Sequence, residues 1–221
     1  MTRFIVVRHG HSVANKACVF AGHVDTPLNE TGKRQAEHVA SYLATLGRID
    51  HIFYSGLTRT KQTAAPSAAL LGLPLQVETG LREIFAGLWE NLSYKVIDSC
   101  YHDDWMVWVH DFSYARPTGG ESVREHYFRV ERTVHRLAAA HEEQTLLLFT
   151  HCTPVRVMNA MAAGLPPEQI DRAAVPLNAS VSTYHYENGK LFADEQNRIT
   201  YPLHLSVSGR FPRPPQMPNE K

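Results

Sequence analysis

The sequence has few cysteines, no excess of charge of either sign and no long apolar run. Its three cysteines, Cys18, Cys100 and Cys152, are odd in number and not closely spaced, which argues against a disulfide framework or a zinc knuckle and for a reducing compartment. Lysine plus arginine and aspartate plus glutamate number 22 each, so the chain has no net positive charge that would attract nucleic acid or an anionic membrane. No apolar run approaches about 18 residues, and the first residues already read as a strand, so we expect neither a signal peptide nor a membrane span. These absences predict a soluble cytoplasmic protein without a nucleic-acid or membrane partner.

A length of 221 residues suits one α/β domain with a modest insertion. Apolar patterns predict strands at 2–7, 51–54, 75–78, 145–150, 181–186 and 190–192, and helices at 31–46, 58–71 and 122–140. Ser122 and Glu125 form a capping box at the last helix, and Asn188-Gly189 predicts a type I′ hairpin turn. Strands separated by helices imply a doubly wound, mostly parallel sheet with helices on both faces and an antiparallel edge. We expect one domain over residues 1–205 and a proline-rich, irregular tail over 206–221.

Residues 91–120 belong to no obvious strand–helix unit. This stretch is rich in aromatic residues, namely Tyr94, Tyr101, Trp105, Trp108, Phe112 and Tyr114. One interpretation is a helical insertion whose aromatic side chains pack on the body of the domain. The other is a lid over the active site whose aromatic side chains shape the substrate pocket. The two interpretations are compatible, and the second alone predicts substrate specificity.

The tripeptide Arg8-His9-Gly10 lies where the first apolar strand ends. Open α/β sheets bind ligands outside the carboxyl ends of their strands, so this is the expected place of the chemistry. An arginine presents a fixed fork of donors that suits a phosphate, and a neutral histidine presents a nucleophilic nitrogen. The tripeptide alone is a weak signal, and the rest of the chain has to support it.

Three further segments carry candidate residues. Arg59 lies at the start of the helix that follows the 51–54 strand, and a helix amino terminus is itself an anion site. Glu83 stands among apolar residues in 81–90, where a carboxyl pKa tends to rise. His151 follows the continuous apolar run 145–150, so it occupies the same kind of position as His9.

With these segments in place, the chain resembles the histidine phosphatase superfamily, in the branch that contains cofactor-dependent phosphoglycerate mutases and small broad-specificity phosphatases. The resemblance runs in order from Arg3 to about His185 and includes Asp25-Thr26-Pro27-Leu28 and Gly32-Lys33-Arg34-Gln35-Ala36. It implies a phosphomonoester hydrolase that needs no metal and no cofactor and that acts on a small phosphorylated metabolite.

The resemblance also implies a role for each matching residue. His9 is the nucleophile that attacks phosphorus and forms a phosphohistidine, and its other ring nitrogen should donate to a backbone carbonyl. Glu83 is the general acid for the leaving group and then the base that activates water. The expected phosphate pocket comprises Arg8, Ser12, Asn15, Gly22, Arg59, His151 and Cys152.

Alternatives remain for the acid, for His151 and for the reaction. Glu78, Glu90 or Asp25 could act in place of Glu83, and His151 could be a packed core histidine. A mutase of this family carries Glu-Arg-His-Tyr-Gly around its acid, and this motif is absent here, so hydrolysis is favoured over mutase-type phosphoryl transfer. A third alternative is a protein that binds a phosphorylated ligand without turnover.

Two other hydrolase classes fit the residues poorly. A cysteine phosphatase needs an arginine six positions after its cysteine, whereas Arg156 follows Cys152 by four. A metal site built from His9, His11 and His102-Asp103 lacks a fourth ligand at helical spacing.

The sequence departs from the family pattern at three positions. His11 replaces an acid, which should make the pocket more positive, and Asn91 replaces a glycine, which should alter the turn into the insertion. Cys152 replaces a glycine and adds a side chain that is open to oxidation. None of these changes removes a residue expected to touch phosphate, so we expect activity to persist with altered specificity. The other histidines, among them His23 and His126, are expected to be packed or solvated.

Overall fold

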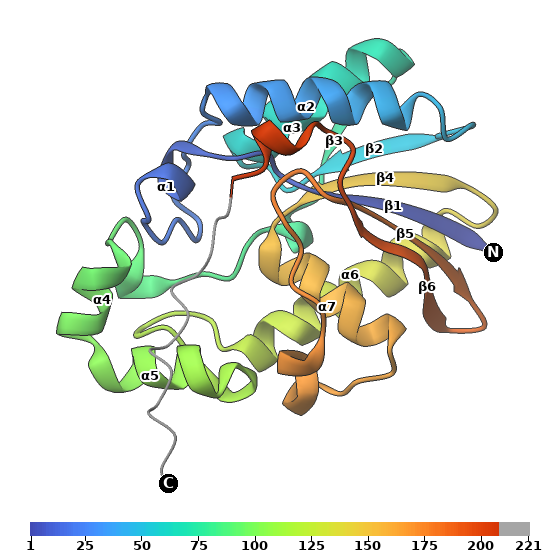
Figure 1. Ribbon diagram of the computed structural model, residues 1–221. Coiled ribbons are helices and arrows are strands. Elements are labelled where there is room, and N and C mark those ends of the chain that lie inside the picture. Colours follow the sequence, from blue (N-terminus) through green and yellow to red (C-terminus); the bar gives the residue numbers. More distant parts are fainter. Residues whose placement is uncertain (208–221) are drawn as a thin grey trace, which may run out of the picture.

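The computed structural model describes residues 1–207 and has a six-stranded sheet at its centre (Figure 1). The strands are β1 (Thr2–Arg8), β2 (His51–Tyr54), β3 (Leu75–Val77), β4 (Thr145–Thr150), β5 (Val181–Glu187) and β6 (Lys190–Arg198). Their order is β3-β2-β4-β1-β5-β6, in which the first four run parallel. Strand β5 is antiparallel to β1, and β6 is antiparallel to β5. The predicted mostly parallel sheet with an antiparallel edge is confirmed.

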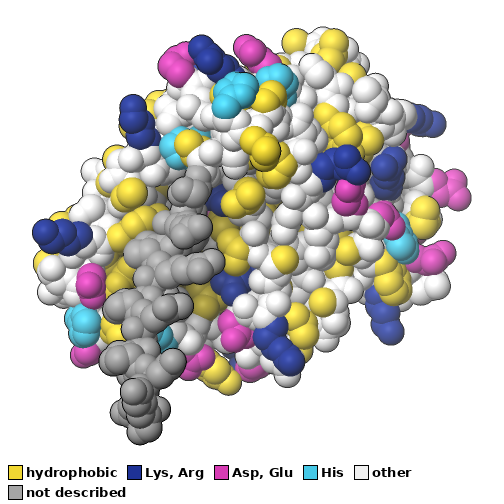
Figure 2. Space-filling model, viewed as in Figure 1, with side chains coloured by type: hydrophobic (Ala, Val, Ile, Leu, Met, Phe, Trp, Pro, Cys, Tyr) yellow, Lys and Arg dark blue, Asp and Glu magenta, His cyan; other side chains and the backbone are white. Residues whose placement is uncertain are grey.

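Helices cover both faces of this sheet, with α2 and α3 on one face and α6 and α7 on the other (Figure 1). The α-helices of the described residues are α1 (Val13–Lys16), α2 (Glu30–Leu43), α3 (Thr58–Leu71), α4 (Tyr94–Cys100), α5 (His102–His110), α6 (Val123–Ala140) and α7 (Cys152–Ala162). None of the helices in residues 1–207 is long and apolar enough to cross a membrane. On the face of the molecule in Figure 2, acidic and basic side chains are interspersed rather than gathered by sign.

The alternation of strand side chains between the two faces explains why β1 and β4 are continuously apolar. In β1, Phe4 and Val6 belong to the core beneath α6 and α7, whereas Ile5 and Val7 belong to the core beneath α2 and α3. In β4 the residues at 146 and 148 contribute to the first core and those at 147 and 149 to the second. A strand covered on both faces has no solvent-facing positions that would favour polar residues.

Several predicted boundaries hold, and the differences have local causes. Strands β2 and β4 and helix α3 span the predicted residues, and the capping box of Ser122 and Glu125 is confirmed. Asn188 and Gly189 both have positive φ, as a type I′ turn requires. Helix α2 ends at Leu43 rather than at 46, and β6 continues to Arg198 rather than ending at 192. The residues that extend β6 are mostly exposed and polar, so no apolar pattern marked them.

The insertion predicted at 91–120 forms α4, α5 and a short 3-10 turn, Phe112–Tyr114. Its aromatic side chains pack on one another and on the body, with Trp108 at the centre. The ring centroid of Trp108 lies 5.2 Å from that of Phe20, 5.8 Å from that of Trp89 and 4.9 Å from that of Phe112. The predicted division into a domain over 1–205 and a tail over 206–221 stays a prediction, since residues 208–221 lie outside the described part of the chain.

Strand register brings three polar residues together at one edge of the sheet. Arg8 pairs with Thr150 and Tyr54 pairs with Phe149, so the residues that follow β1, β4 and β2 are neighbours. These residues are His9, His151 and Ser55. The sheet therefore places the candidate site at the carboxyl ends of its parallel strands, as open α/β sheets do.

Candidate active site

A pocket lies at this edge of the sheet. Its lining includes eight of the nine residues predicted for the site, namely Arg8, His9, Ser12, Asn15, Gly22, Arg59, Glu83 and Cys152. The remaining lining residues are Val19, Phe20, Ala21, Tyr94, Trp108 and Thr153. His151 does not line the pocket but contacts two residues that do. Because Tyr94 and Trp108 come from α4 and α5, the insertion forms part of the pocket wall.

His9 is held in the form that a nucleophile needs. Its Nδ1 lies 2.8 Å from the carbonyl oxygen of Gly10, and because a carbonyl only accepts, Nδ1 carries the proton and Nε2 is left bare. The pKa of His9 is lowered well below its ordinary value by burial, and next by the positive charges of Arg59 and Arg8. The ring is therefore neutral at neutral pH, and the predicted hydrogen bond to a backbone carbonyl is confirmed.

His151 lies beside His9, with ring centroids 5.2 Å apart, and both of its nitrogens are engaged. Nε of Arg59 donates to Nδ1 over 3.2 Å, so the neutral ring carries its proton on Nε2 and donates to Oγ of Ser55 over 2.7 Å. Burial, with the charge of Arg59 second, lowers the pKa of His151 well below its ordinary value. His151 thus orients the guanidinium of Arg59 from behind the pocket.

Arg59 is fully buried and is aimed by main-chain carbonyls as well as by His151. Nη1 donates to the carbonyl oxygen of Val24 and Nη2 to that of Gly22, over 2.9 and 2.7 Å. One N–H on each terminal nitrogen remains for a ligand. Burial lowers the pKa of Arg59 to about 10, so the group is still a cation at neutral pH.

Gly22 has no room for a side chain. Its φ is +49°, in the left-handed region, and a Cβ there would lie 2.4 Å from Oε1 of Glu90. Oε1 of Glu90 accepts from the backbone N–H of His23 over 2.7 Å, so this carboxylate holds the loop in place. The position therefore requires glycine if the Gly22 carbonyl is to reach Arg59.

Arg8 and Asn15 supply further donors. Nη1 of Arg8 donates to the carbonyl oxygen of Pro176 over 2.7 Å, and its buried Nε has no hydrogen-bond partner within the described residues. Oδ1 of Asn15 accepts from the N–H of Ser12 and from Nδ2 of Asn178, each over 3.1 Å. Because the oxygen of Asn15 is occupied, its amide group is left to donate. Both residues therefore present N–H groups, which suits an anion.

The Glu83 carboxylate lies at the amino terminus of α7. Its oxygens accept from the backbone N–H groups of Cys152 and Thr153, over 3.1 and 3.2 Å, and Oε1 also accepts from the N–H of Ile84 over 3.0 Å. The N-cap residue of α7, His151, makes no side-chain cap, so Glu83 supplies it from a distant part of the chain.

The carboxylates considered as alternatives to Glu83 are engaged elsewhere. Asp25 accepts from the N–H and the hydroxyl of Thr58 at the start of α3. Glu78 pairs with Arg136, and Glu90 binds the loop that contains Gly22. Among the pocket-lining residues, Glu83 is the only acidic side chain.

The structure describes the surroundings of the three residues that depart from the expected pattern, His11, Asn91 and Cys152. Burial lowers the pKa of His11, whose Nδ1 lies 2.7 Å from Nδ2 of Asn29. His11 is therefore neutral at neutral pH, so any gain of positive charge comes from the loss of the acid and not from the imidazole, and it stays a prediction. Asn91 has φ +63°, a conformation that asparagine tolerates better than most residues. That the turn differs from one with glycine stays a prediction. Burial raises the pKa of the Cys152 thiol, which disfavours the reactive thiolate and counters the expected sensitivity to oxidation.

Sequence reasoning missed Ser55 and Asn178. Ser55 stands at the end of β2, so the rule that predicted His9 and His151 would also have found it. Asn178 donates to the carbonyl oxygen of His9 over 3.1 Å, and no motif pointed to it. No group of three or more His, Cys, Asp or Glu side chains within residues 1–207 is placed to hold a metal ion.

Comparison with known proteins identifies the family of this chain. The family model of the histidine phosphatase superfamily (branch 1) matches residues 4–198. The chain is 28% identical over 201 residues to the adenosylcobalamin/alpha-ribazole phosphatase of Escherichia coli, covering 87% of this chain and 98% of that protein. It is 30% identical over 187 residues to phosphoserine phosphatase 1 of Hydrogenobacter thermophilus, covering 85% and 88%. The structure of Bacillus stearothermophilus YhfR has the same fold, with a TM-score of 0.86 at 21% identity over 93% of this chain and 100% of that one. The chain therefore belongs to the histidine phosphatase superfamily, branch 1, and has phosphatases among its relatives.

Proposed function

We propose that this protein is a metal-independent phosphomonoester hydrolase that forms a covalent phosphohistidine on His9. The observation that carries the proposal is the hydrogen bond from Nδ1 of His9 to the Gly10 carbonyl. It leaves Nε2 without a proton in a pocket that also contains two guanidinium groups and one carboxylate. Such a neutral, oriented imidazole beside cations is suited to attack phosphorus.

In the first step, Nε2 of His9 bonds to phosphorus while the bond from phosphorus to the leaving oxygen breaks. The charge on the phosphoryl oxygens is matched by N–H groups of Arg8, Asn15 and Arg59, which are already oriented before the reaction. Ser12 caps the helix that carries Asn15, the Gly22 carbonyl accepts from Arg59, and His151 orients Arg59. The Cys152 side chain forms part of the wall.

Glu83 is the proposed proton carrier. In its protonated form it gives a proton to the leaving oxygen, and as a carboxylate it then takes one from the water that attacks the phosphohistidine. The second step forms the bond from water oxygen to phosphorus and releases His9 and inorganic phosphate. Its place as the acidic residue of the pocket lining supports this role over Glu90.

The proposed substrate is a small phosphorylated metabolite. The pocket lining provides Arg8 and Arg59 as cations, and both are placed for the phosphate. A phosphoglycerate also carries a carboxylate, which would need a further cation, so the lining favours hydrolysis over mutase-type transfer. Phe20, Tyr94 and Trp108 add apolar surface, which favours a substrate whose alcohol portion is apolar or carries a ring. The free thiols of the described residues accord with action in the cytoplasm.

The covalent intermediate is tested by a rapid alkaline quench with a ³²P-labelled phosphomonoester. Label should appear on the peptide that contains Arg8-His9-Gly10 and should be lost in acid, and His9→Ala should abolish both label and turnover. Label on Cys152 would contradict the mechanism. Label on His9 that is formed once and never released would instead support the binding protein without turnover.

The absence of a metal requirement is tested with p-nitrophenyl phosphate. Release of phosphate should withstand excess chelator, and vanadate should inhibit because it mimics the trigonal bipyramidal transition state. Activity that is lost on chelation and restored by an added metal would contradict the proposal.

The acid is tested by the dependence on the leaving group. Nitrophenolate leaves readily without a proton, whereas an alkoxide does not, so Glu83→Gln should slow the first turnover of an alkyl phosphate much more than that of p-nitrophenyl phosphate. Glu90→Gln is the matched control and should show no such difference. Equal losses for both substrates in Glu83→Gln would remove Glu83 from the acid role.

A further inference from the structure

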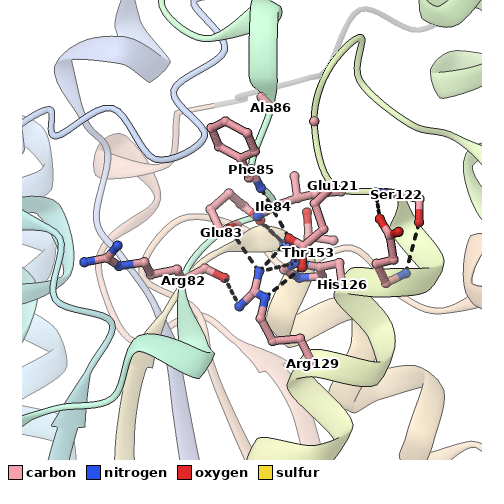
Figure 3. Close-up of polar contacts among 12 residues, drawn as sticks. Arg82, Glu83, Ile84, Phe85, Ala86, Glu121, Ser122, His126, Arg129 and Thr153 are labelled. Atoms are coloured by element: carbon pink, nitrogen blue, oxygen red, sulfur yellow. Dashed lines mark hydrogen bonds and ion pairs between the residues drawn. The ribbon is translucent and has the colours of Figure 1, made fainter.

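The main chain that carries Glu83 is bound by a single arginine of α6. Nη1 of Arg129 donates to the carbonyl oxygens of Gly80 and Arg82, over 2.8 and 3.2 Å, and Nη2 donates to that of Glu83 over 3.2 Å. Figure 3 shows the guanidinium of Arg129 directed from α6 toward this segment, with Thr153 close to the Glu83 side chain. One planar group thus spans the residues that lead up to the proposed acid.

Arg129 is itself fixed by Glu121. Its Nε and Nη2 donate to the two carboxylate oxygens of Glu121, each over 2.8 Å, in a two-point pair. Burial alone would raise the pKa of Glu121, but the hydrogen bonds from Arg129 hold this pKa well below its usual range. Glu121 also binds the same segment through its main chain, since its N–H donates to the carbonyl oxygen of Phe85 over 2.8 Å.

His126 supports the guanidinium from the interior. The ring is completely buried, and its Nδ1 lies 2.7 Å from Nη2 of Arg129 and 3.1 Å from Oε2 of Glu121. The guanidinium only donates and the carboxylate only accepts, so the tautomer of His126 decides which of these two contacts is the hydrogen bond. Burial lowers the pKa of His126, which keeps the ring neutral. The ring thus packs against both members of the Arg129–Glu121 pair.

The carbonyl of Glu83 is also bound from the opposite side. Nε2 of His23, in the loop next to Gly22, lies 2.8 Å from this oxygen and donates to it. The backbone of Glu83 is thus held between α6 and the pocket loop, while its carboxylate reaches the amino terminus of α7. A proton donor must sit within hydrogen-bond reach of the leaving oxygen, and a displacement of about 1 Å can cost about 100-fold in rate.

We propose that Arg129, held by Glu121 and His126, is a positioning residue that sets the location of the Glu83 carboxylate in the reaction. This inference rests on the proposed function, because it assigns Arg129 a task that exists only if Glu83 transfers a proton. Stability alone is a weak explanation for the cluster, since buried ion pairs can often be replaced by apolar residues without loss of stability. The fork of donors toward these three carbonyls is what an apolar replacement would lose.

The test compares Arg129→Gln and Arg129→Lys with a control on the same helix, Arg124→Gln. Arg124 pairs with Glu168 at the surface, with side chains 64% and 39% exposed. The substrates are p-nitrophenyl phosphate and phenyl phosphate, which share a ring and differ in how much the leaving oxygen needs a proton. The readout is the first turnover, in which only phosphorylation of the enzyme is observed.

We expect Arg129→Gln to slow the first turnover of phenyl phosphate by about 10- to 100-fold and that of p-nitrophenyl phosphate by far less. Lysine keeps the charge beside Glu121 but cannot span the carbonyls, so Arg129→Lys should show the same selectivity with a smaller loss. Arg124→Gln should match the parent on both substrates. Should Arg129→Gln fail to fold, the selectivity of Arg129→Lys decides the question.

A double variant separates positioning from a general loss of structure. If Arg129 acts through Glu83, then Arg129→Gln should add little to the loss that Glu83→Gln already causes with phenyl phosphate. Equal losses on both substrates in the Arg129 variants, or full additivity with Glu83→Gln, would overturn the inference. If Glu83→Gln itself shows no selectivity between the substrates, the acid assignment in the proposed function fails instead.

Discussion

The hydrogen-bonded chain behind the pocket leads to a prediction about two serines of equal burial. Nε2 of His151 donates to Oγ of Ser55, and the Ser55 hydroxyl lies 2.9 Å from Oγ1 of Thr60, which donates to the Leu57 carbonyl. The donor and acceptor of each hydrogen bond in this chain are fixed, because Arg59 donates to Nδ1 of His151 and so places the ring proton on Nε2. Ser67 on α3 is equally buried, but its Oγ has no hydrogen-bond partner in the described residues. The same substitution, serine to alanine, should therefore have different consequences at the two positions.

Ser55→Ala leaves the Nε2–H of His151 buried and without an acceptor, which costs about 1–3 kcal/mol. For a chain of this length, each kcal/mol lowers Tm by about 2–4 °C, so we expect a Tm lower by roughly 2–12 °C. Ser67→Ala removes a hydroxyl that is already unsatisfied and places a better helix former in α3. The free energy of unfolding should then be unchanged or higher by up to about 1 kcal/mol.

Urea denaturation followed by circular dichroism measures both free energies, with the slope m as a check that the unfolded states are alike. Ser55→Ala should also turn over p-nitrophenyl phosphate more slowly, because His151 then no longer holds Arg59 in one orientation. A loss of stability as large in Ser67→Ala as in Ser55→Ala would refute the reasoning. So would a Ser55→Ala protein that unfolds at the same urea concentration as the parent.

Three further predictions concern pH, the pocket loop and the buried thiol. Burial and the neighbouring guanidinium groups lower the pKa of His9, so the neutral form that is proposed to attack phosphorus persists on acidification. The acid limb of the first-turnover rate with p-nitrophenyl phosphate should therefore lie below pH 6.5, the ordinary pKa of histidine, and a limb at or above 6.5 would contradict this. Gly22→Ala should reduce kcat/KM by at least about tenfold, because a Cβ would lie 2.4 Å from Oε1 of Glu90 and the strained φ adds about 1–2 kcal/mol; a parent-like value would show that the loop adapts. Iodoacetamide should alkylate exposed Cys18 quickly and buried Cys152 slowly in the native protein, with the difference lost in urea, as peptide mass spectrometry would show.

The parts of the fold that the sequence predicts best are those with a clear burial pattern. Strands β1 and β4 are apolar on both faces, and α6 has one apolar stripe and a capping box, so each was predicted nearly to the residue. Helix α7 was not predicted because most of its positions are buried. A helix buried on most sides shows no polar face, and Pro154 in its first turn further obscures the pattern.

The site residues also differ in how well the sequence predicts them. His9, Arg59, Glu83 and the other pocket residues carry local motifs, and the structure brings nearly all of them to one pocket. Asn178 and Arg129 act through main-chain carbonyls that are far away in sequence; the Asn178 contact with His9 spans 169 positions. A carbonyl is present at every residue, so no residue type marks it as an acceptor, and only the folded chain reveals such contacts.

The position of Glu83 at the start of α7 also affects how this chain could lose activity over evolution. Substitution of Glu83 removes a helix cap together with the proposed proton carrier, and loss of a cap costs typically about 1 kcal/mol. Loss of the His9 side chain removes one hydrogen bond, to the neighbouring Gly10 carbonyl. Mutational drift that abolishes turnover is therefore better tolerated at His9 than at Glu83. Among descendants of this chain, inactive proteins are therefore expected to lack the histidine at position 9. They are expected to keep the glutamate at position 83, because it still caps α7.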